Sequence, residues 1–263
     1  MADGLGGDHE LWLTRFGAVV SRYLRSPGGM SPRAGAAEFT EPIDRAFVRC
    51  GAGEASIEGM LWPAWQAVIS AADTPEDAAR SRLVGLLSAI RARGILVRPG
   101  GEECVVWDMR AYADLPLFGA QMRETWNLSP PAVSAQSWAN LNAFAAQLTM
   151  AGIDFSLYAI WALRHALEEE SPQVSQVLPA AVQWFRHAGS VLASLALECT
   201  ADAHGADWAG ELCREAGLID HGFTIRRWNF WKSRLGDIAA AGGEAAEKAR
   251  EGLRYMHASI PDP

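Results

Sequence analysis

The sequence predicts an all-α protein, a single large helical bundle of about eight to ten helices with an aromatic-rich core. Three observations predict this fold class. Apolar residues recur at three- and four-residue steps along most of the chain. Residues typical of helix starts precede several of these stretches. Eleven tryptophans in 263 residues need a wide interior to bury their rings. The sequence shows no convincing pair of strands joined by a hairpin turn.

The first helices follow from apolar spacing and from start signals. An apolar stripe predicts a helix over 9–24, and the composition of 26–35, SPGGMSPRAG, predicts a flexible linker after it. Thr40, two residues before a proline, is expected to cap the next helix. A further start signal, Thr-Pro-Glu-Asp, predicts a helix over 74–93 that ends at a glycine.

A loop rich in aromatic and charged residues follows. Pro-Gly-Gly breaks the helical pattern at 99, and we expect 99–116 to be an ordered loop between the N- and C-terminal halves of one domain, 1–263. Within the loop, 103–107 is expected to be a short extended piece. The remaining helices should begin at Ser134, at Asp154 and at Thr224, among other sites. We expect these later helices at 134–151, 154–169, 177–199, 205–216 and 224–241, with a last one ending near 258.

The composition favours a cytoplasmic globular protein. The formal net charge is −8, which argues against general binding to nucleic acids or to anionic membranes, since both need an excess of Lys and Arg. No basic segment followed by an apolar run indicates a secretory signal, and no apolar stretch is long enough to span a bilayer. Four dispersed cysteines are typical of free thiols in a reducing compartment.

Several enzyme classes lack their motifs in this sequence. There is no aspartate-rich DDxxD segment, no Glu-x-x-His pair, no GxSxG, no P-loop and no GxGxxG. His165 and Glu169 have a spacing suited to metal ligands on a helix, but a single pair is weak support for a metal site. We therefore expect no metal and no bound cofactor.

The stretch FTIRRWNFWKSRL, 223–235, mixes aromatic and basic residues as a nucleic-acid groove would. On a helical wheel, Trp228 and Trp231 fall on one apolar side, and Arg227 lies along the edge of that side. We interpret the stretch as a core helix with a basic edge. The same rings could instead line a ligand pocket.

Arg164 lies in the middle of the apolar stripe of its helix, where an unpaired charge would be costly. One interpretation is a structural ion pair with Glu168 or with Asp108. The other is that Arg164 points into a pocket, where it binds a carboxylate or polarises a carbonyl.

Three further polar residues are candidates for catalysis. Asn142 borders an inward face, where it either ties neighbouring backbone together or binds a ligand. His187 lies along one edge of its helix, so it is either solvated or a general acid or base. Asp108 belongs to the ordered loop, in which it either pins the loop or contributes to a site. The residues expected to bind substrate are Trp107, Trp138, Trp161, Trp184, Arg227, Trp228 and Trp231.

Five sequence blocks together resemble a known family. They are W-D-x(6)-L-P at 107–116, W-x-N-L-N-A-F at 138–144, W-A-L-R-x-A-L-E at 161–168, A-V-Q-W at 181–184 and R-W-N-F-W-K at 227–232. In this order they resemble a fungal family of cytosolic helical proteins catalogued as a domain of unknown function, over about 50–240. The resemblance implies a fungal source, an all-helical domain and an association with secondary-metabolite biosynthesis. It implies no catalytic residues.

Two functions from different classes remain open. The first is a cofactor-independent cyclase or isomerase, such as a pericyclase of the Diels–Alder type, that folds an apolar small molecule in an aromatic pocket. The second is a non-catalytic helical module that binds a partner protein or a small ligand. A homodimer is compatible with either function. The family association favours the enzyme.

Overall fold

The computed structural model describes residues 3–25, 29–130, 132–171, 173–199 and 208–260. In this part of the chain it contains eleven α-helices, two short π-helices and one two-stranded sheet, so the predicted all-α class is confirmed. Contacts within the chain gather into two compact units, Met1–Leu128 and Ser129–Pro263. No helix of the described residues is long and apolar enough to cross a membrane.

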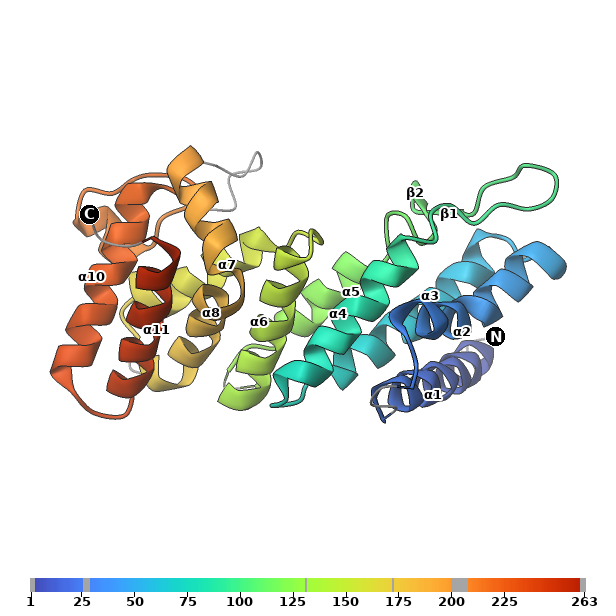
Figure 1. Ribbon diagram of the computed structural model, residues 1–263, viewed down its shortest axis with the longest axis horizontal. Helices are drawn as coiled ribbons and strands as arrows, with labels where there is room; N and C mark the ends of the chain where they lie inside the picture. Colours follow the sequence, from blue (N-terminus) through green and yellow to red (C-terminus); the bar gives the residue numbers. More distant parts are fainter. Residues whose placement is uncertain (1–2, 26–28, 131, 172, 200–207, 261–263) are drawn as a thin grey trace. The chain divides into compact units, whose positions relative to one another are not determined.

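Among the described residues, unit 1 contains five α-helices (Figure 1), and a row of four aromatic rings lies in its core. Phe39 lies 5.0 Å from Phe16 and 5.8 Å from Trp65, centroid to centroid, and Trp65 lies 5.6 Å from Phe118. The indole N–H of Trp65 donates to the carbonyl of Pro116 at 2.7 Å. The elements of this unit are α1 (Asp3–Arg25), α2 (Pro32–Asp44), π-helix η1 (Arg45–Arg49), α3 (Glu54–Ala71), α4 (Asp77–Arg91), β1 (Val105–Val106), β2 (Met109–Arg110) and α5 (Phe118–Trp126).

The start of α2 differs from the expectation. Ser31 accepts a hydrogen bond from the backbone N–H of Ala34, and Pro32 occupies the first turn, so 32–35 of the expected linker are helical. Residues 26–28 of that linker lie outside the described residues. The expected cap at Thr40 is wrong, because Thr40 lies inside α2 and its hydroxyl donates to the carbonyl of Ala36. Two start signals therefore compete in this stretch, and the earlier one begins the helix.

Unit 2 is organised around α8, which packs against four other α-helices and the π-helix η2 (Figure 1). Ser134 accepts from the N–H of Ser137 and Thr224 accepts from the N–H of Arg227, so these two expected caps are confirmed. At the third expected start, Asp154 accepts from the N–H of Ser156, but the N-cap position of α7 is Phe155. Of the predicted helix 205–216, residues 205–207 lie outside the described residues. The elements of this unit are α6 (Ala135–Met150), α7 (Ser156–Leu163), π-helix η2 (Arg164–Glu168), α8 (Val174–Glu198), α9 (Glu211–Glu215), α10 (Ile225–Ala241) and α11 (Ala246–Ser259).

The loop between α4 and α5 contains the hairpin that the sequence did not reveal. β1 and β2 are antiparallel, with Val105 opposite Arg110 and Val106 opposite Met109. Of the extended piece expected at 103–107, residues 105–106 form β1, whose partner is the segment that follows directly, whereas Trp107 belongs to the turn. A two-residue turn of Trp107 and Asp108 joins the strands, and this pair lacks the Asn-Gly or Asp-Gly signature of such turns.

Candidate functional site

An ion pair without solvent exposure lies in unit 2. Arg227 Nε donates to Glu168 Oε1 at 2.6 Å, and Arg227 Nη2 donates to Glu168 Oε2 at 2.9 Å, with both side chains 0% exposed. The indole N–H of Trp231 donates to Oε1 at 2.6 Å, and the backbone N–H of Gly210 donates to Oε2 at 2.6 Å. Four hydrogen bonds to the carboxylate offset part of the cost of removing both charges from water.

Three segments bring these groups together. Glu168 ends the π-helix η2, a widened helical turn, and Arg227 lies in the first turn of α10. Gly210 allows the close approach of the third segment. A Cβ at that position would lie 2.6 Å from the Cβ of Glu168 and 2.7 Å from its carbonyl oxygen. The remaining donors of Arg227 reach the carbonyls of Gly222 at 2.8 Å and Trp208 at 3.1 Å.

This geometry corrects two expectations about charge. The sequence placed Arg227 along the edge of its helix, whereas the side chain is fully buried. It also offered Glu168 as the partner of Arg164. Because Glu168 is used by Arg227, Arg164 pairs instead with Glu169 at 3.6 Å and donates to the carbonyl of Trp208 at 3.3 Å. Arg164 is half-buried, and the structural ion pair is the interpretation that these contacts support.

Asn142 connects two helices of unit 2. Its amide nitrogen donates to the carbonyl of Trp138, one turn earlier in α6, at 2.9 Å. Its oxygen accepts from the indole N–H of Trp184 in α8 at 2.7 Å. Both Asn142 and Trp184 have no exposed surface. These bonds correspond to the interpretation in which Asn142 ties neighbouring groups together, since a buried amide needs such partners.

The other residues predicted for unit 2 lie at different depths. Trp138 and Trp228 are buried, and the ring of Trp228 meets that of Phe185 edge-on at 5.6 Å. Trp161 is half-buried, and its ring lies 5.0 Å from that of Tyr158. His187 is half-buried on α8. Their roles in catalysis or substrate binding stay predictions.

Trp107 and Asp108 form the exposed turn of the β1–β2 hairpin in unit 1. Their φ angles are 52° and 59°, so both residues adopt the left-handed region, as a type I′ turn requires. The backbone N–H of Trp107 donates to a carboxylate oxygen of Glu54 at 2.9 Å. Trp107 is 54% exposed, so this tryptophan lies on the surface and does not line an enclosed pocket.

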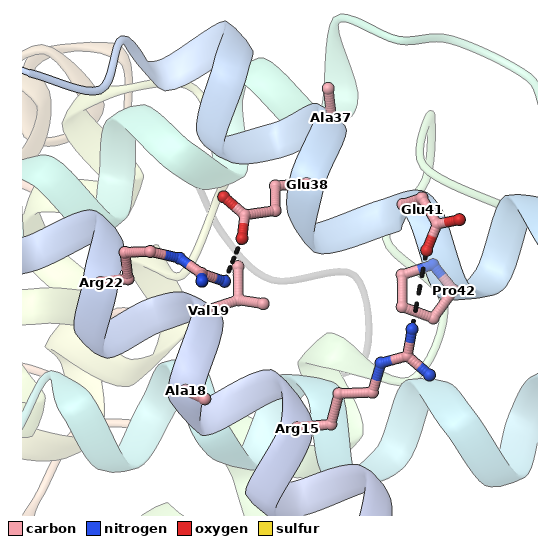
Figure 2. Close-up of a pocket in the computed structure, with 8 residues that line it drawn as sticks. All are labelled: Arg15, Ala18, Val19, Arg22, Ala37, Glu38, Glu41 and Pro42. Atoms are coloured by element: carbon pink, nitrogen blue, oxygen red, sulfur yellow. Dashed lines mark hydrogen bonds and ion pairs between the residues drawn. The ribbon is translucent and has the colours of Figure 1, made fainter.

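A pocket of about 380 Å³ lies between α1 and α2 of unit 1 (Figure 2). Its apolar wall consists of Ala18 and Val19 from α1 and of Ala37 and Pro42 from α2. Ala18 and Ala37 are exposed, so the pocket is open to solvent.

Two ion pairs border this pocket. Arg22 on α1 donates to Glu38 on α2, and Arg15 lies 3.6 Å from Glu41 (Figure 2). Pro42 has no N–H, so it cannot donate to the carbonyl of Glu38, as the residue four positions on in a helix usually does. The pocket therefore offers guanidinium donors and carboxylate acceptors beside an apolar wall. This combination suits a small molecule with one polar end.

None of the residues predicted for catalysis or substrate binding lines this pocket. A partial signal for it exists in the sequence. Arg15 and Arg22 are seven residues apart, and Glu38 and Glu41 are three apart, so each pair shares a helix face. The assignment of 26–35 to a linker, with the next helix starting at Thr40, left Glu38 outside the predicted helix and concealed that it shares a face with Glu41. Within the described residues, no group of three or more His, Cys, Asp or Glu could hold a metal ion.

Together these features define an all-helical protein with a buried ion-pair centre in one unit and an amphipathic pocket in the other. A family model described as "Protein of unknown function (DUF3632)" matches residues 65–235, and the chain belongs to this family. The resemblance to a family catalogued as a domain of unknown function is thereby confirmed. Over 256 aligned residues the chain is 28% identical to "Oxopyrrolidines biosynthesis cluster protein G" of Penicillium oxalicum, covering 83% of this chain and 71% of that protein. No solved structure matches the chain.

Proposed function

We propose that this protein acts in the biosynthesis of a secondary metabolite and binds a small-molecule intermediate in the pocket between α1 and α2. The observation that carries the proposal is the pocket itself, about 380 Å³ in volume and lined by an apolar wall between two ion pairs. Ligand sites of such size with few polar groups are typical of small-molecule binding. The relative from an oxopyrrolidine biosynthesis cluster supports the pathway context.

The reaction we propose is a cyclisation or isomerisation without a cofactor. Guanidinium donors at Arg15 and Arg22 would stabilise negative charge that develops on a carbonyl oxygen of the ligand. A carboxylate, Glu38 or Glu41, would remove a proton from the adjacent carbon and return it at another position. The apolar wall would hold the carbon skeleton in one folded conformation. Such a proton shift balances within the ligand and needs no second reactant.

The pocket residues serve this reaction better than those the sequence suggested in unit 2. The side chains of Asn142, Trp184, Arg227 and Trp231 have no exposed surface, and hydrogen bonds within the protein already engage their polar atoms. The pocket lies N-terminal to the segment that the family model matches, 65–235. The proposed ligand is therefore a property of this chain and of relatives that share α1 and α2.

The test is ligand retention by the full chain. The purified protein is incubated with a metabolite extract of the organism that carries its gene, and retained compounds are identified by mass spectrometry. Ala18→Trp and Ala37→Trp place a ring in the open pocket, and we expect each to lower retention of the bound compound at least tenfold. The matched control is Ala34→Trp, an exposed position on α2 that does not line the pocket.

Turnover is then measured with the retained compound. If Glu38→Gln or Glu41→Gln slows conversion of the compound but still retains it, the result supports the proton shift. If the protein retains the compound without converting it, the enzymatic function is rejected and the protein is a ligand-binding module. Equal retention by the wild type, both blocked variants and the control would reject the pocket as the binding site.

A further inference from the structure

The outer face of the small sheet in unit 1 is a row of exposed apolar side chains. Val97 pairs with Glu103 and Ile95 pairs with Tyr112, so the segment before β1 lies against the strands of the hairpin. Side chains alternate along extended backbone, which places 95, 97, 103 and 105 on one face. On this face Ile95, Val97 and Val105 are 36%, 42% and 38% exposed, whereas Cys104 and Val106 face inward and are buried.

Trp107 follows at the turn, two residues after Val105, and it is also exposed. With Trp107, the face holds four of the ten large apolar side chains that are exposed in the described part of the chain. We define the outer face as Ile95, Val97, Val105 and Trp107. In Figure 1 the segment between α4 and α5 projects beyond the helices of unit 1. Apolar side chains gathered in this way mark interaction sites on folded proteins.

Backbone strain is concentrated next to this face. Six residues other than glycine have positive φ in the described chain, and five of them lie within 107–117. They are Trp107, Asp108, Tyr112, Leu115 and Leu117. Each such conformation costs on the order of 1–3 kcal/mol and persists only where surrounding contacts enforce it. Strain of this kind gathers at functional segments.

The surrounding contacts hold the strained segment firmly. The buried hydroxyl of Tyr112 donates to Asp44 at 2.8 Å, which ties the segment to the end of α2. Arg110 forms a two-point ion pair with Asp114 at 2.9 and 3.0 Å. The hydrogen bonds from Arg110 hold the pKa of Asp114 low, at about 2. The outer face is therefore presented by a rigid segment, which lowers the entropic cost of binding.

The charges around the outer face are mainly negative. Two guanidiniums, Arg98 and Arg110, are already paired with Glu102 and Asp114. The face and its turn carry five carboxylates, those of Glu54, Glu102, Glu103, Asp108 and Asp114. A third guanidinium, that of the exposed Arg91, acts electrostatically on Asp114. Five carboxylates against three guanidiniums leave a net charge of −2. A symmetric dimer through this face would set like charges against each other, and an anionic membrane would repel it.

We propose that the outer face binds a basic amphipathic helix of another protein. The apolar stripe of such a helix would cover Ile95, Val97, Val105 and Trp107. Its lysines or arginines would meet the carboxylates at the rim, which gives charge complementarity. Trp107 is the anchor, since an exposed, rigid indole contributes more to an interface than the smaller side chains around it. This site lies within the segment that defines the family, 65–235.

The test uses the full chain and three synthetic helical peptides of equal length. All three carry the same leucine stripe, and their polar positions are lysine, glutamine or glutamate. Affinity is measured by fluorescence anisotropy of the labelled peptides at low and high salt. We expect the lysine peptide to bind about tenfold more tightly than the glutamine peptide, with the advantage reduced at high salt. The glutamate peptide should bind most weakly.

Variants locate the binding. Trp107→Ser should weaken binding of the lysine peptide about tenfold or more. The double variant Glu103→Gln and Asp108→Asn should reduce the preference for the lysine peptide over the glutamine peptide. The apolar contact should remain. Trp208→Ser is the matched control, because Trp208 is 60% exposed and belongs to unit 2. Val97→Thr keeps a residue suited to a strand and should weaken binding in the same direction as Trp107→Ser.

Three results would overturn the proposal. Equal affinity for the three peptides would show that charge does not select the partner. Unchanged binding by Trp107→Ser, or an equal loss in Trp208→Ser, would place the contact elsewhere. If the wild type self-associates and Trp107→Ser abolishes this association, the outer face binds a second copy of the chain instead of a basic helix. The pocket variant Ala18→Trp should leave peptide binding unchanged, which separates this site from the proposed ligand pocket.

Discussion

Arg227 and Glu168, 59 residues apart in sequence, form a two-point ion pair in which neither side chain has any exposed surface. The pair joins the start of α10 to the end of η2. The indole of Trp231 and the backbone of Gly210 complete the hydrogen bonds of the carboxylate. Its contribution is best tested by removing one charge, because an unpaired buried charge costs far more than a well-made pair gains.

Glu168→Gln should lower the free energy of unfolding by about 3–5 kcal/mol, because it leaves the guanidinium of Arg227 buried without a countercharge. The measurement is urea-induced unfolding followed by circular dichroism. The control is Glu169→Gln, which removes the exposed partner of Arg164 and should cost about 0–1 kcal/mol. Equal losses of unfolding free energy in the two variants would show that the buried pair contributes no more to stability than the exposed pair.

Gly210→Ala should destabilise the protein by about 1–3 kcal/mol, because the new methyl group has no space. Its Cβ would meet the Cβ and the carbonyl oxygen of Glu168 at 2.6 and 2.7 Å, and the backbone atom cannot move aside cheaply. Gly236→Ala in α10 is the control, since nothing lies within 4 Å of its Cβ. In a helix interior that change should stabilise by about 0.5–1 kcal/mol. Thermal unfolding of both variants checks the contrast.

Much of the fold was predictable because it rests on local signals. Apolar spacing located the helices, and Ser134 and Thr224 begin helices as their side chains suggest. Local signals failed where two of them competed. The earlier start at Ser31 prevailed over Thr40, which lies inside α2. The hairpin was missed because its turn begins with Trp107, a residue type that seldom adopts positive φ, and contains no glycine.

The sites were less predictable because they depend on contacts between distant segments. The helical wheel correctly placed Trp228 and Trp231 in the core, but it could not show that Glu168 would turn toward Arg227. A π-helical turn changes which residues share a face, and the sequence gives no signal for it. The pocket depends on α1 and α2 lying side by side, which the spacing within either helix does not specify.

The stability of the protein should fall as the pH rises above about 9, because two buried thiols resist ionisation. Burial raises the pKa of Cys104 to about 11. Burial, with the nearby Glu168 carboxylate adding to it, raises the pKa of Cys213 to about 12. Between pH 9 and these values the unfolded chain releases thiol protons that the folded chain keeps. Each thiol then lowers the free energy of unfolding by up to about 1.4 kcal/mol per pH unit.

The slope of stability against pH distinguishes these thiols from other groups. Cys104→Ala and Cys213→Ala leave cavities and lower stability at every pH, but each should also flatten the decline between pH 9 and 11. Cys50→Ala is the control, because its thiol is exposed. That variant should keep the slope of the wild type. Parallel slopes for all four proteins would contradict the prediction.

The combined change Trp107→Asn and Asp108→Gly should raise the free energy of unfolding by about 1–2 kcal/mol. Both positions have positive φ, where Asn and Gly are accepted at low cost and where tryptophan is strained. Urea unfolding measures the gain, and Trp208→Asn is the control at an exposed tryptophan without positive φ. The control should stay within about 0.5 kcal/mol of the wild type.

Whether this double change raises or lowers the free energy of unfolding distinguishes two explanations for the presence of a tryptophan at the turn. If the indole of Trp107 stabilised the fold by packing, its loss would lower stability in spite of the better turn. We expect the opposite, because Trp107 is 54% exposed and its backbone is strained. The stabilised turn variant should also lose affinity for the basic peptide. A gain in stability coupled to a loss of binding would mean that the strain at this turn is kept for recognition.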